Sequence, residues 1–163
     1  MHITWISDGI VTKMKLYIGG YAQGKLDYVL QKFREEKEGY GDGQSEKFVI
    51  VDGESIVEDI VEKREGEEMG ERAVIINHFH KYIRKELILH PDWGMKEIEK
   101  KVNHICLQYP NCTIICDEVG NGIVPIDAFE RKYREMVGRI CCVLAQRSKS
   151  VERIHCGLGM RLK

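Results

Sequence analysis

The sequence lacks several features that would assign it to a familiar class of protein. No apolar run approaches the roughly 18 residues of a membrane span, and the first ten residues lack the basic-then-apolar order of a signal peptide. The formal net charge is only -1, so no global field favours nucleic acid or an anionic membrane. These absences predict a cytoplasmic protein whose main partner is neither nucleic acid nor a membrane.

The cysteines also lack a recognisable pattern. There are six, and they form neither a C-x-x-C pair nor a paired metal-ligand spacing. Most stand inside apolar segments, which predicts reduced thiols in a hydrophobic core. No internal repeat is present, and 163 residues with 43% hydrophobic content fit one domain with a core of ordinary size.

Short β-rich runs alternate with amphipathic stretches, which predicts an α/β domain on a mostly parallel sheet. The expected strands are nearly all apolar, as strands covered on both faces should be. They span residues 16–18, 48–51, 73–76, 113–116 and 153–156. The expected helices span residues 25–36, 55–64, 79–87, 95–108 and 127–147. Residues 35–46, with glycines among charges, are expected to form a mobile loop.

The beginning of the chain fits this α/β pattern poorly. Residues 1–13 are interpreted as an N-terminal extension, an extra edge strand or the product of a start codon placed too early, and these alternatives stay open. Residues 14–163 are predicted to form the single domain. Within it, Asp127 with Glu130 three positions later predicts the start of the last helix.

The most informative segment is the glycine-rich stretch after the first expected strand. Gly19 and Gly24 hold the glycine positions of the G-x-x-x-x-G-K-[ST] pattern, and Lys25 holds the lysine position. In such a loop, backbone amides and the following helix N-terminus bind phosphate oxygens. Leu26 stands where a Mg²⁺-binding hydroxyl belongs, so the pattern predicts a nucleotide site that lacks one metal ligand. The predicted nucleotide-binding residues are Gly19, Gly20, Tyr21, Ala22, Gln23, Gly24, Lys25 and Leu26.

A second set of motifs, in the C-terminal half, is more selective than the loop. Residues 116–125 read Cys-Asp-Glu-Val-Gly-Asn-Gly-Ile-Val-Pro, and they are followed by Tyr-Arg-Glu, Gly-Arg and a closing Gly-Leu-Gly-Met-Arg-Leu-Lys. With the glycine-rich loop, these motifs resemble the adenosylcobinamide kinase / adenosylcobinamide-phosphate guanylyltransferase family of cobalamin biosynthesis. The resemblance runs from about Met14 to Lys163.

The resemblance implies a P-loop NTPase-like fold with a mostly parallel central sheet. It implies that GTP or ATP phosphorylates the aminopropanol hydroxyl of an adenosylcobinamide-like corrinoid, and that GMP is then transferred to the product through a histidine-bound intermediate. It further implies a homo-oligomer. Glu118 would be the acidic residue after the fourth strand, with Gly120 and Gly122 shaping the turn beside it.

Three departures from the family pattern bear on activity. Leu26 replaces the Mg²⁺-binding Ser or Thr, and Asn77 stands where the family usually carries an acidic residue. The interval from Phe33 to Phe48 is short and contains no histidine, so the guanylyltransferase half-reaction loses its nucleophile. We therefore expect a shortened member that retains at most phosphoryl transfer. Two alternatives stay open: a catalytically impaired nucleotide- or corrinoid-binding protein, and a structural partner of an active paralogue.

Lys25 and Glu118 are the predicted catalytic residues. Lys25 would stabilise charge on the transferred phosphoryl group, and Glu118 would orient the acceptor hydroxyl or a metal-bound water. The competing interpretation makes Glu118 a carboxylate that only stabilises a turn or a helix cap. Asp117 is a possible substitute for Glu118.

Four further side chains are candidates for the site. His78 and His80 either replace the missing histidine or form a solvated pair at a strand-to-helix turn. Arg134 and Arg139 either face a phosphate or bridge to carboxylates on neighbouring elements. Together with four residues introduced above, they complete the additional site candidates: Asn77, His78, His80, Asp117, Gly120, Gly122, Arg134 and Arg139.

Overall fold

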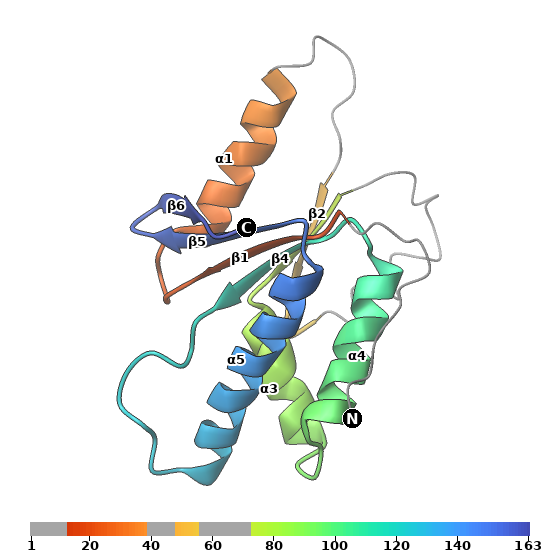
Figure 1. Cartoon of the computed structure of the whole chain (residues 1–163), viewed down its shortest axis with the longest axis vertical. Coiled ribbons are helices and arrows are strands. Elements are labelled where there is room, and N and C mark those ends of the chain that lie inside the picture. Colours follow the sequence, from red (N-terminus) through yellow and green to blue (C-terminus); the bar gives the residue numbers. More distant parts are fainter. Residues whose placement is uncertain (1–12, 39–47, 56–72) are drawn as a thin grey trace.

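A six-stranded sheet forms the centre of the structure, a computed structural model that describes residues 13–38, 48–55 and 73–163. Its strands are β1 (Lys15–Gly19), β2 (Phe48–Asp52), β3 (Ala73–Asn77), β4 (Thr113–Asp117), β5 (Ser150–His155) and β6 (Leu158–Arg161). They lie in the order β2-β3-β4-β1-β5-β6, as Figure 1 shows. Neighbours from β2 to β5 are parallel, and only β6 runs antiparallel, against β5. The predicted α/β class with a mostly parallel sheet is confirmed.

Helices cover both faces of this sheet. The helices are α1 (Lys25–Glu38), α3 (Phe79–Leu89), α4 (Met95–Gln108) and α5 (Ala128–Arg147). In Figure 1, α1 lies on one face, whereas α3, α4 and α5 lie together on the other. Parallel strands between two helical layers are buried on both faces, which explains why their sequences are nearly continuous apolar runs.

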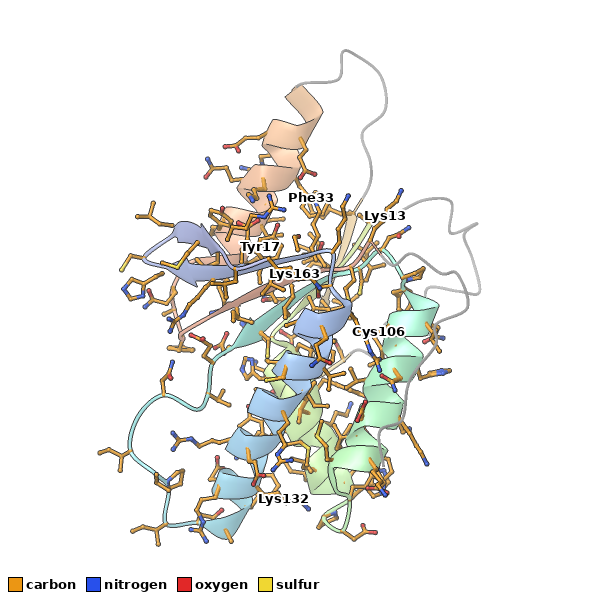
Figure 2. The ribbon with its side chains drawn as sticks, viewed as in Figure 1. Lys13, Tyr17, Phe33, Cys106, Lys132 and Lys163 are labelled. Carbon is orange, nitrogen blue, oxygen red and sulfur yellow. The ribbon has the colours of Figure 1, made fainter. Side chains whose placement is uncertain are left out.

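The side chains of each strand alternate between two hydrophobic clusters. Tyr17 belongs to the cluster beneath α1, which also contains Val29 and Ile154. Its neighbour Leu16 belongs to the larger cluster beneath α3, α4 and α5. Figure 2 labels Tyr17 and Phe33 on the α1 side and Cys106 on the opposite side. The larger cluster takes most of the apolar face of α5, so the apolar content of this helix serves the core.

The helix boundaries agree closely with the pattern-based expectations. α4 spans the expected residues, and α5 begins directly after Asp127, whose side chain accepts a hydrogen bond of 2.9 Å from the amide of Glu130. One correction concerns residues 35–38, which continue α1 instead of opening a loop. The expected helix over 55–64 lies outside the described residues apart from Ser55, which stands in a turn. Residues 1–12 and 39–47 also lie outside them, so the division of the chain near residue 13 stays a prediction.

The C-terminal strands differ most from the bounds expected from the sequence. β5 begins at Ser150, three residues before the expected start, and β6 was not expected at all. A two-residue turn joins them, with positive φ at Cys156 (50°) and Gly157 (74°). Two consecutive left-handed residues match the twist of an antiparallel hairpin, so the chain folds straight back on itself.

The connections around β1 make the carboxyl ends of β1 and β4 a topological switch point of the sheet. The chain leaves β1 through α1 on one face of the sheet, and it leaves the adjacent β4 through α5 on the other. In an open parallel sheet, a ligand binds beyond the carboxyl ends of two such strands. The candidate residues at Gly19 and Asp117 stand opposite each other at this edge.

Candidate functional site

The loop between β1 and α1 has an unusual backbone that fixes its shape. A Cβ atom on Gly19 would lie 2.4 Å from the carbonyl oxygen of Ile154, so only glycine fits there. Ala22 and Gly24 both have positive φ, at 55° and 76°. Left-handed residues within a turn gather main-chain N–H groups on one side, which creates an anion-binding concavity. α1 follows immediately at Lys25, with the positive end of its dipole toward the loop.

The first amides of α1 are available for a ligand. Within the described part of the chain, the main-chain N–H groups of Gly24, Lys25 and Leu26 donate to no other residue. Gln23 meanwhile fastens the loop to the β5–β6 turn: its carbonyl accepts 2.9 Å from the amide of Gly157, and its side-chain oxygen accepts 2.7 Å from the amide of Cys156. The loop is thus fastened to the β5–β6 turn, while these three amides have no partner in the part of the chain that the structure describes.

Lys25 is buried and points into the site. Only 7% of its side chain is exposed, and its ammonium lies 2.8 Å from Oδ1 of Asp117, which is equally buried. The ammonium also donates a hydrogen bond of 2.6 Å to the carbonyl of Gly20. The lysine of the phosphate-binding pattern therefore already holds a carboxylate and the loop backbone together. An entering phosphate would meet an ammonium that is in place.

Glu118 lies at the same edge, but its carboxylate pairs with Arg153 and Lys25 pairs with Asp117. Its amide donates 2.9 Å to the carbonyl of Gly19, so the loop and the acidic residues after β4 are adjacent. Its carboxylate accepts two hydrogen bonds from Arg153 of β5, at 3.0 and 3.1 Å. The acidic side chain beside Lys25 is Asp117, which the sequence interpretation held only as a substitute. The catalytic role of Glu118 stays a prediction.

His80 is buried against β4 in its neutral form. Its Nδ1 atom accepts a hydrogen bond of 3.3 Å from the amide of Asp117, and its Nε2 atom lies 3.8 Å from the carboxylate of the same residue. Burial lowers the pKa of His80, and the nearby Asp117 carboxylate only partly offsets that effect. A neutral imidazole that accepts at Nδ1 carries its proton at Nε2. His80 thus supports the main chain of β4 at the point where Asp117 meets Lys25.

His78 behaves differently, although it stands only two residues away. It precedes α3 with a left-handed backbone (φ 53°, ψ 44°), and its Nδ1 atom lies 2.7 Å from Oδ2 of Asp52 at the end of β2. Its ring meets the ring of His80 edge-on, with centroids 5.8 Å apart. Asn77, the last residue of β3, approaches the same Nδ1 atom at 3.4 Å. The two histidines are therefore not an equivalent solvated pair: His78 is partly exposed and His80 is buried.

The two candidate arginines have separate positions on α5. Arg134 donates to the carbonyls of Gly120 and Ile123, at 2.6 and 2.5 Å, and so fixes the loop after β4. Gly122 is part of that loop, with φ 122°. Arg139 forms an exposed ion pair of 2.7 Å with Glu135 on the same helix. Neither arginine contacts the Lys25–Asp117 pair in the structure.

The described residues do not supply the set of oxygen ligands that the phosphate-loop pattern normally gives Mg²⁺. Leu26 has no side-chain oxygen, and Asp117 is engaged with Lys25. Among the residues that the structure covers, no group of three His, Cys, Asp or Glu side chains is arranged to hold a metal. Residues 13–38, 48–55 and 73–163 likewise contain no helix long and apolar enough to cross a membrane.

Two residues of the site were not singled out from the sequence. Asp52 follows an apolar strand, and the carboxyl end of a parallel strand is where polar ligand-binding residues collect, so its position was a usable signal. Arg153 sits inside β5 and contacts Glu118 only because β5 and β4 flank β1. Its contact depends on strand order, which periodicity does not reveal.

The fold and the edge of the sheet together define a P-loop NTPase-like protein. A sequence model of the cobinamide kinase / cobinamide phosphate guanyltransferase family matches residues 43–162, which is well over half of the chain. The chain therefore belongs to this family, as its motifs predicted. Membership gives it a role of this transferase type in cobalamin biosynthesis, with nucleotide and corrinoid substrates.

The matched region begins after the glycine-rich loop. Residues 19–26 are thus assigned to the site by their own pattern and geometry, because the family match does not include them. A search among curated proteins finds no match.

Proposed function

We propose that the protein binds GTP or ATP with its phosphates at residues 19–26 and transfers the γ-phosphoryl group to the hydroxyl of a cobinamide-like corrinoid. One observation carries the nucleotide proposal: the amides of Gly24, Lys25 and Leu26 at the start of α1 have no partner among the described residues, and the buried ammonium of Lys25 lies beside them. Helix N-terminal amides and a lysine are the groups that bind the outer phosphates of a triphosphate.

Phosphate binding would reorganise the lysine contacts. A nucleoside triphosphate brings several negative charges to an ammonium that now contacts Asp117 and the carbonyl of Gly20. The phosphate oxygens would replace the carbonyl of Gly20 as the partner of Lys25. The carbonyl of Gly20 is neutral, whereas a phosphate oxygen carries negative charge, so the added attraction to the ammonium favours the loaded state. Mg²⁺, where present, would enter with the nucleotide phosphates.

The guanylyl-transfer half-reaction is proposed to be absent or altered. The interval from Phe33 to Phe48 has no histidine, and the sequence contains none anywhere between His2 and His78. The stretch that carries the nucleotidylated histidine in the resembling family is therefore without one. We infer that phosphoryl transfer is the activity to test first.

A second candidate function is nucleotide or corrinoid binding without turnover. The observation that favours it is that Leu26 replaces a metal-binding hydroxyl and Asn77 stands where the family usually carries an acidic residue. A cation that bridges two phosphates contributes several kcal/mol of transition-state stabilisation. Phosphorylated cobinamide formed from GTP or ATP supports the enzyme, whereas binding without product supports the binder. A structural subunit of an active paralogue would bind neither ligand.

A homo-oligomer is also proposed. Ile123, Val124 and Ile126 expose most of their apolar side chains on the loop between β4 and α5, which Arg134 holds in place. Apolar side chains held rigidly on a surface suit an interface or a ligand. Light scattering after gel filtration measures the mass, and a mass near 18.9 kDa would contradict the oligomer.

The nucleotide proposal is tested by calorimetric titration of GTP and ATP, each with and without Mg²⁺. Lys25→Met is expected to weaken binding by roughly 10- to 100-fold, because a hydrogen bond to a charged group contributes about 1.5–3 kcal/mol. Lys15→Met is the matched control: Lys15 opens β1 at the opposite edge of the sheet and pairs with Glu36 at the surface. Equal affinity in wild-type protein and Lys25→Met would overturn the assignment of this loop.

A further inference from the structure

His78 is held in a backbone conformation that costs energy. Its φ of 53° and ψ of 44° are left-handed, a region in which residues other than glycine are strained by about 1 kcal/mol or more. The surroundings impose it: a Cβ atom on Gly53 would lie 2.2 Å from the carbonyl of His78, so the end of β2 packs directly against this peptide. The same carbonyl accepts 2.8 Å from the amide of Lys81. Such strain is retained mainly where a side chain must be aimed.

The side chain of His78 is aimed by Asp52. Partial burial would raise the pKa of Asp52, but hydrogen bonds from His78 and from the amide of Glu54 outweigh it and lower the pKa. An ionised carboxylate can only accept, so the Nδ1 atom of His78, 2.7 Å away, must be the donor. Neutral His78 therefore carries its proton at Nδ1, and the lone pair lies at Nε2.

That Nε2 atom is available. It has no partner among residues 13–38, 48–55 and 73–163, and 39% of the His78 side chain is exposed. His80 has the opposite arrangement, because it accepts at Nδ1 and is buried. The edge of the sheet thus holds one histidine that supports the fold and one whose basic nitrogen faces outward.

The other bases of the site are already engaged. Asp117 is paired with Lys25, and Glu118 accepts two hydrogen bonds from Arg153. Each of these carboxylates would have to give up a contact with a cation before it could accept a proton from the hydroxyl. His78 is linked to the same centre through the His80 ring, which contacts Asp117. Among the described residues of the site, His78 is the one whose ring has a free lone pair at one nitrogen and a carboxylate contact at the other.

We propose that the Nε2 atom of His78 is the general base that activates the acceptor hydroxyl, with Asp52 as its positioning residue. This inference rests on the proposed phosphoryl transfer. The hydroxyl oxygen forms a bond to the γ-phosphorus while the bond from that phosphorus to the β–γ bridging oxygen breaks. The hydroxyl proton passes to Nε2, and the nucleoside diphosphate leaves with the bond electrons. Asp52 stabilises the resulting imidazolium, as a carboxylate does in other Asp–His pairs.

The titratable groups around His78 set the expected pH dependence. Asp52 faces it from β2, Glu54 follows β2, and the His80 ring faces it from α3. Lys81, also on α3, acts on Asp52 and pairs with Glu54. His80 stays neutral, and Lys81 lies 3.7 Å from Glu54, so its charge is partly balanced. Asp52 is then the charge that acts most directly on the imidazole. A general base acts in its unprotonated form, so the rate of transfer should fall at acid pH.

The first test is His78→Asn. Asparagine tolerates the left-handed backbone and its amide nitrogen can replace Nδ1 as the donor to Asp52, but it has no counterpart of Nε2. The rate of phosphoryl transfer from GTP or ATP to cobinamide is expected to fall by roughly 10²- to 10⁴-fold. The remaining rate should no longer decrease at acid pH, and the nucleotide affinity should be unchanged. His104→Asn, on the exposed face of α4, is the matched control and should leave both properties unchanged.

The second test is Asp52→Asn together with an NMR measurement. Without the carboxylate, the imidazolium that forms in the reaction loses its stabilising charge and the ring loses its positioning partner, so transfer should persist at a reduced rate. In wild-type protein, long-range ¹⁵N–¹H spectra should show the Nδ1–H tautomer for His78 and the Nε2–H tautomer for His80. The Nε2–H tautomer at His78, or an unchanged pH profile in His78→Asn, would overturn the assignment.

The failure of this inference can be told apart from the failure of the proposed function. Absence of nucleotide binding in wild-type protein would refute the nucleotide proposal and, with it, the base. Binding without any transfer would overturn the general-base role of His78 and leave the nucleotide site standing. Transfer that His78→Asn does not slow would refute His78 alone.

Discussion

At the scale of single residues, the site is organised by a buried ion pair. Lys25 and Asp117 come from the helix after β1 and the end of β4, and each side chain is 7% exposed. Two charges removed from water are stable only while they compensate each other. The ammonium can give up its second contact, with the carbonyl of Gly20, for a phosphate oxygen while it keeps its pair with Asp117. A buried pair of this kind keeps the lysine in position before any ligand arrives.

This arrangement predicts a large effect of Asp117→Asn on stability. The isosteric change leaves the Lys25 ammonium buried without its counter-charge, so the free energy of unfolding should fall by about 3 kcal/mol. In the double variant Lys25→Met, Asp117→Asn the stranded charge is removed, and part of the stability should return. Urea unfolding of both variants measures the difference. Glu135→Gln, which breaks the exposed pair with Arg139, is the control and should have little effect.

An equal loss of stability in Asp117→Asn and in the double variant would contradict this account of the pair. It would mean that packing at Asp117, rather than charge, determines the cost. The choice between Asp117 and Glu118 could not be made from the sequence, because the two are adjacent and their surroundings depend on which strands flank β4 and β1. The register of Gly19 with Asp117 decides it.

At the scale of elements, local pattern was sufficient wherever an element has one clear buried face. α4 buries Ile98, Val102 and Ile105 at helical spacing, and its predicted bounds are confirmed. β6 has no such face, since its residues are all exposed, and the turn before it uses Cys156 where Asn or Asp is usual. It pairs with β5 through backbone hydrogen bonds alone, and a hydrophobic pattern cannot predict that.

The start of α5 offers a test of an element boundary. Asp127 accepts from the amide of Glu130, and the carboxylate of Glu130 in turn receives two hydrogen bonds from Arg84 of α3. Asp127→Ala should lower the free energy of unfolding by about 1 kcal/mol, because the cap is lost. Asp127→Asn keeps an acceptor oxygen and should retain most of the stability. The two variants are compared by chemical denaturation, and equal stabilities would show that the cap contributes nothing.

At the scale of the whole molecule, the sheet brings distant parts of the chain to one edge. β1 lies between β4 and β5, so the loop at residue 20 meets acidic residues near 117 and a turn near 156. The family motif after β4 was visible in the sequence, and the fold class followed from the alternation of strands and helices. What stayed hidden were the contacts that cross the sheet, such as Asp52 with His78, since they depend on strand order.

The buried neutral His80 makes the stability of the whole protein depend on pH. Burial lowers its pKa in the folded state, whereas an unfolded histidine titrates near pH 6.5. As the pH falls below about 6.5, His80 therefore binds a proton in the unfolded chain but not in the folded chain. The free energy of unfolding should be constant above about pH 7.5 and decrease below pH 6.5, by up to about 1.4 kcal/mol per pH unit.

The variant His80→Asn isolates this contribution. An asparagine oxygen can accept from the amide of Asp117 in place of Nδ1, but it does not titrate. Denaturation curves between pH 5.5 and pH 7.5, a window in the neighbourhood of the histidine pKa, should show a weaker pH dependence in this variant than in wild-type protein. Carboxylates with lowered pKa, among them Glu152, contribute their own losses at more acid pH. Parallel curves for the two proteins would mean that His80 has the same pKa in the folded and unfolded states, which would contradict its burial as a neutral group.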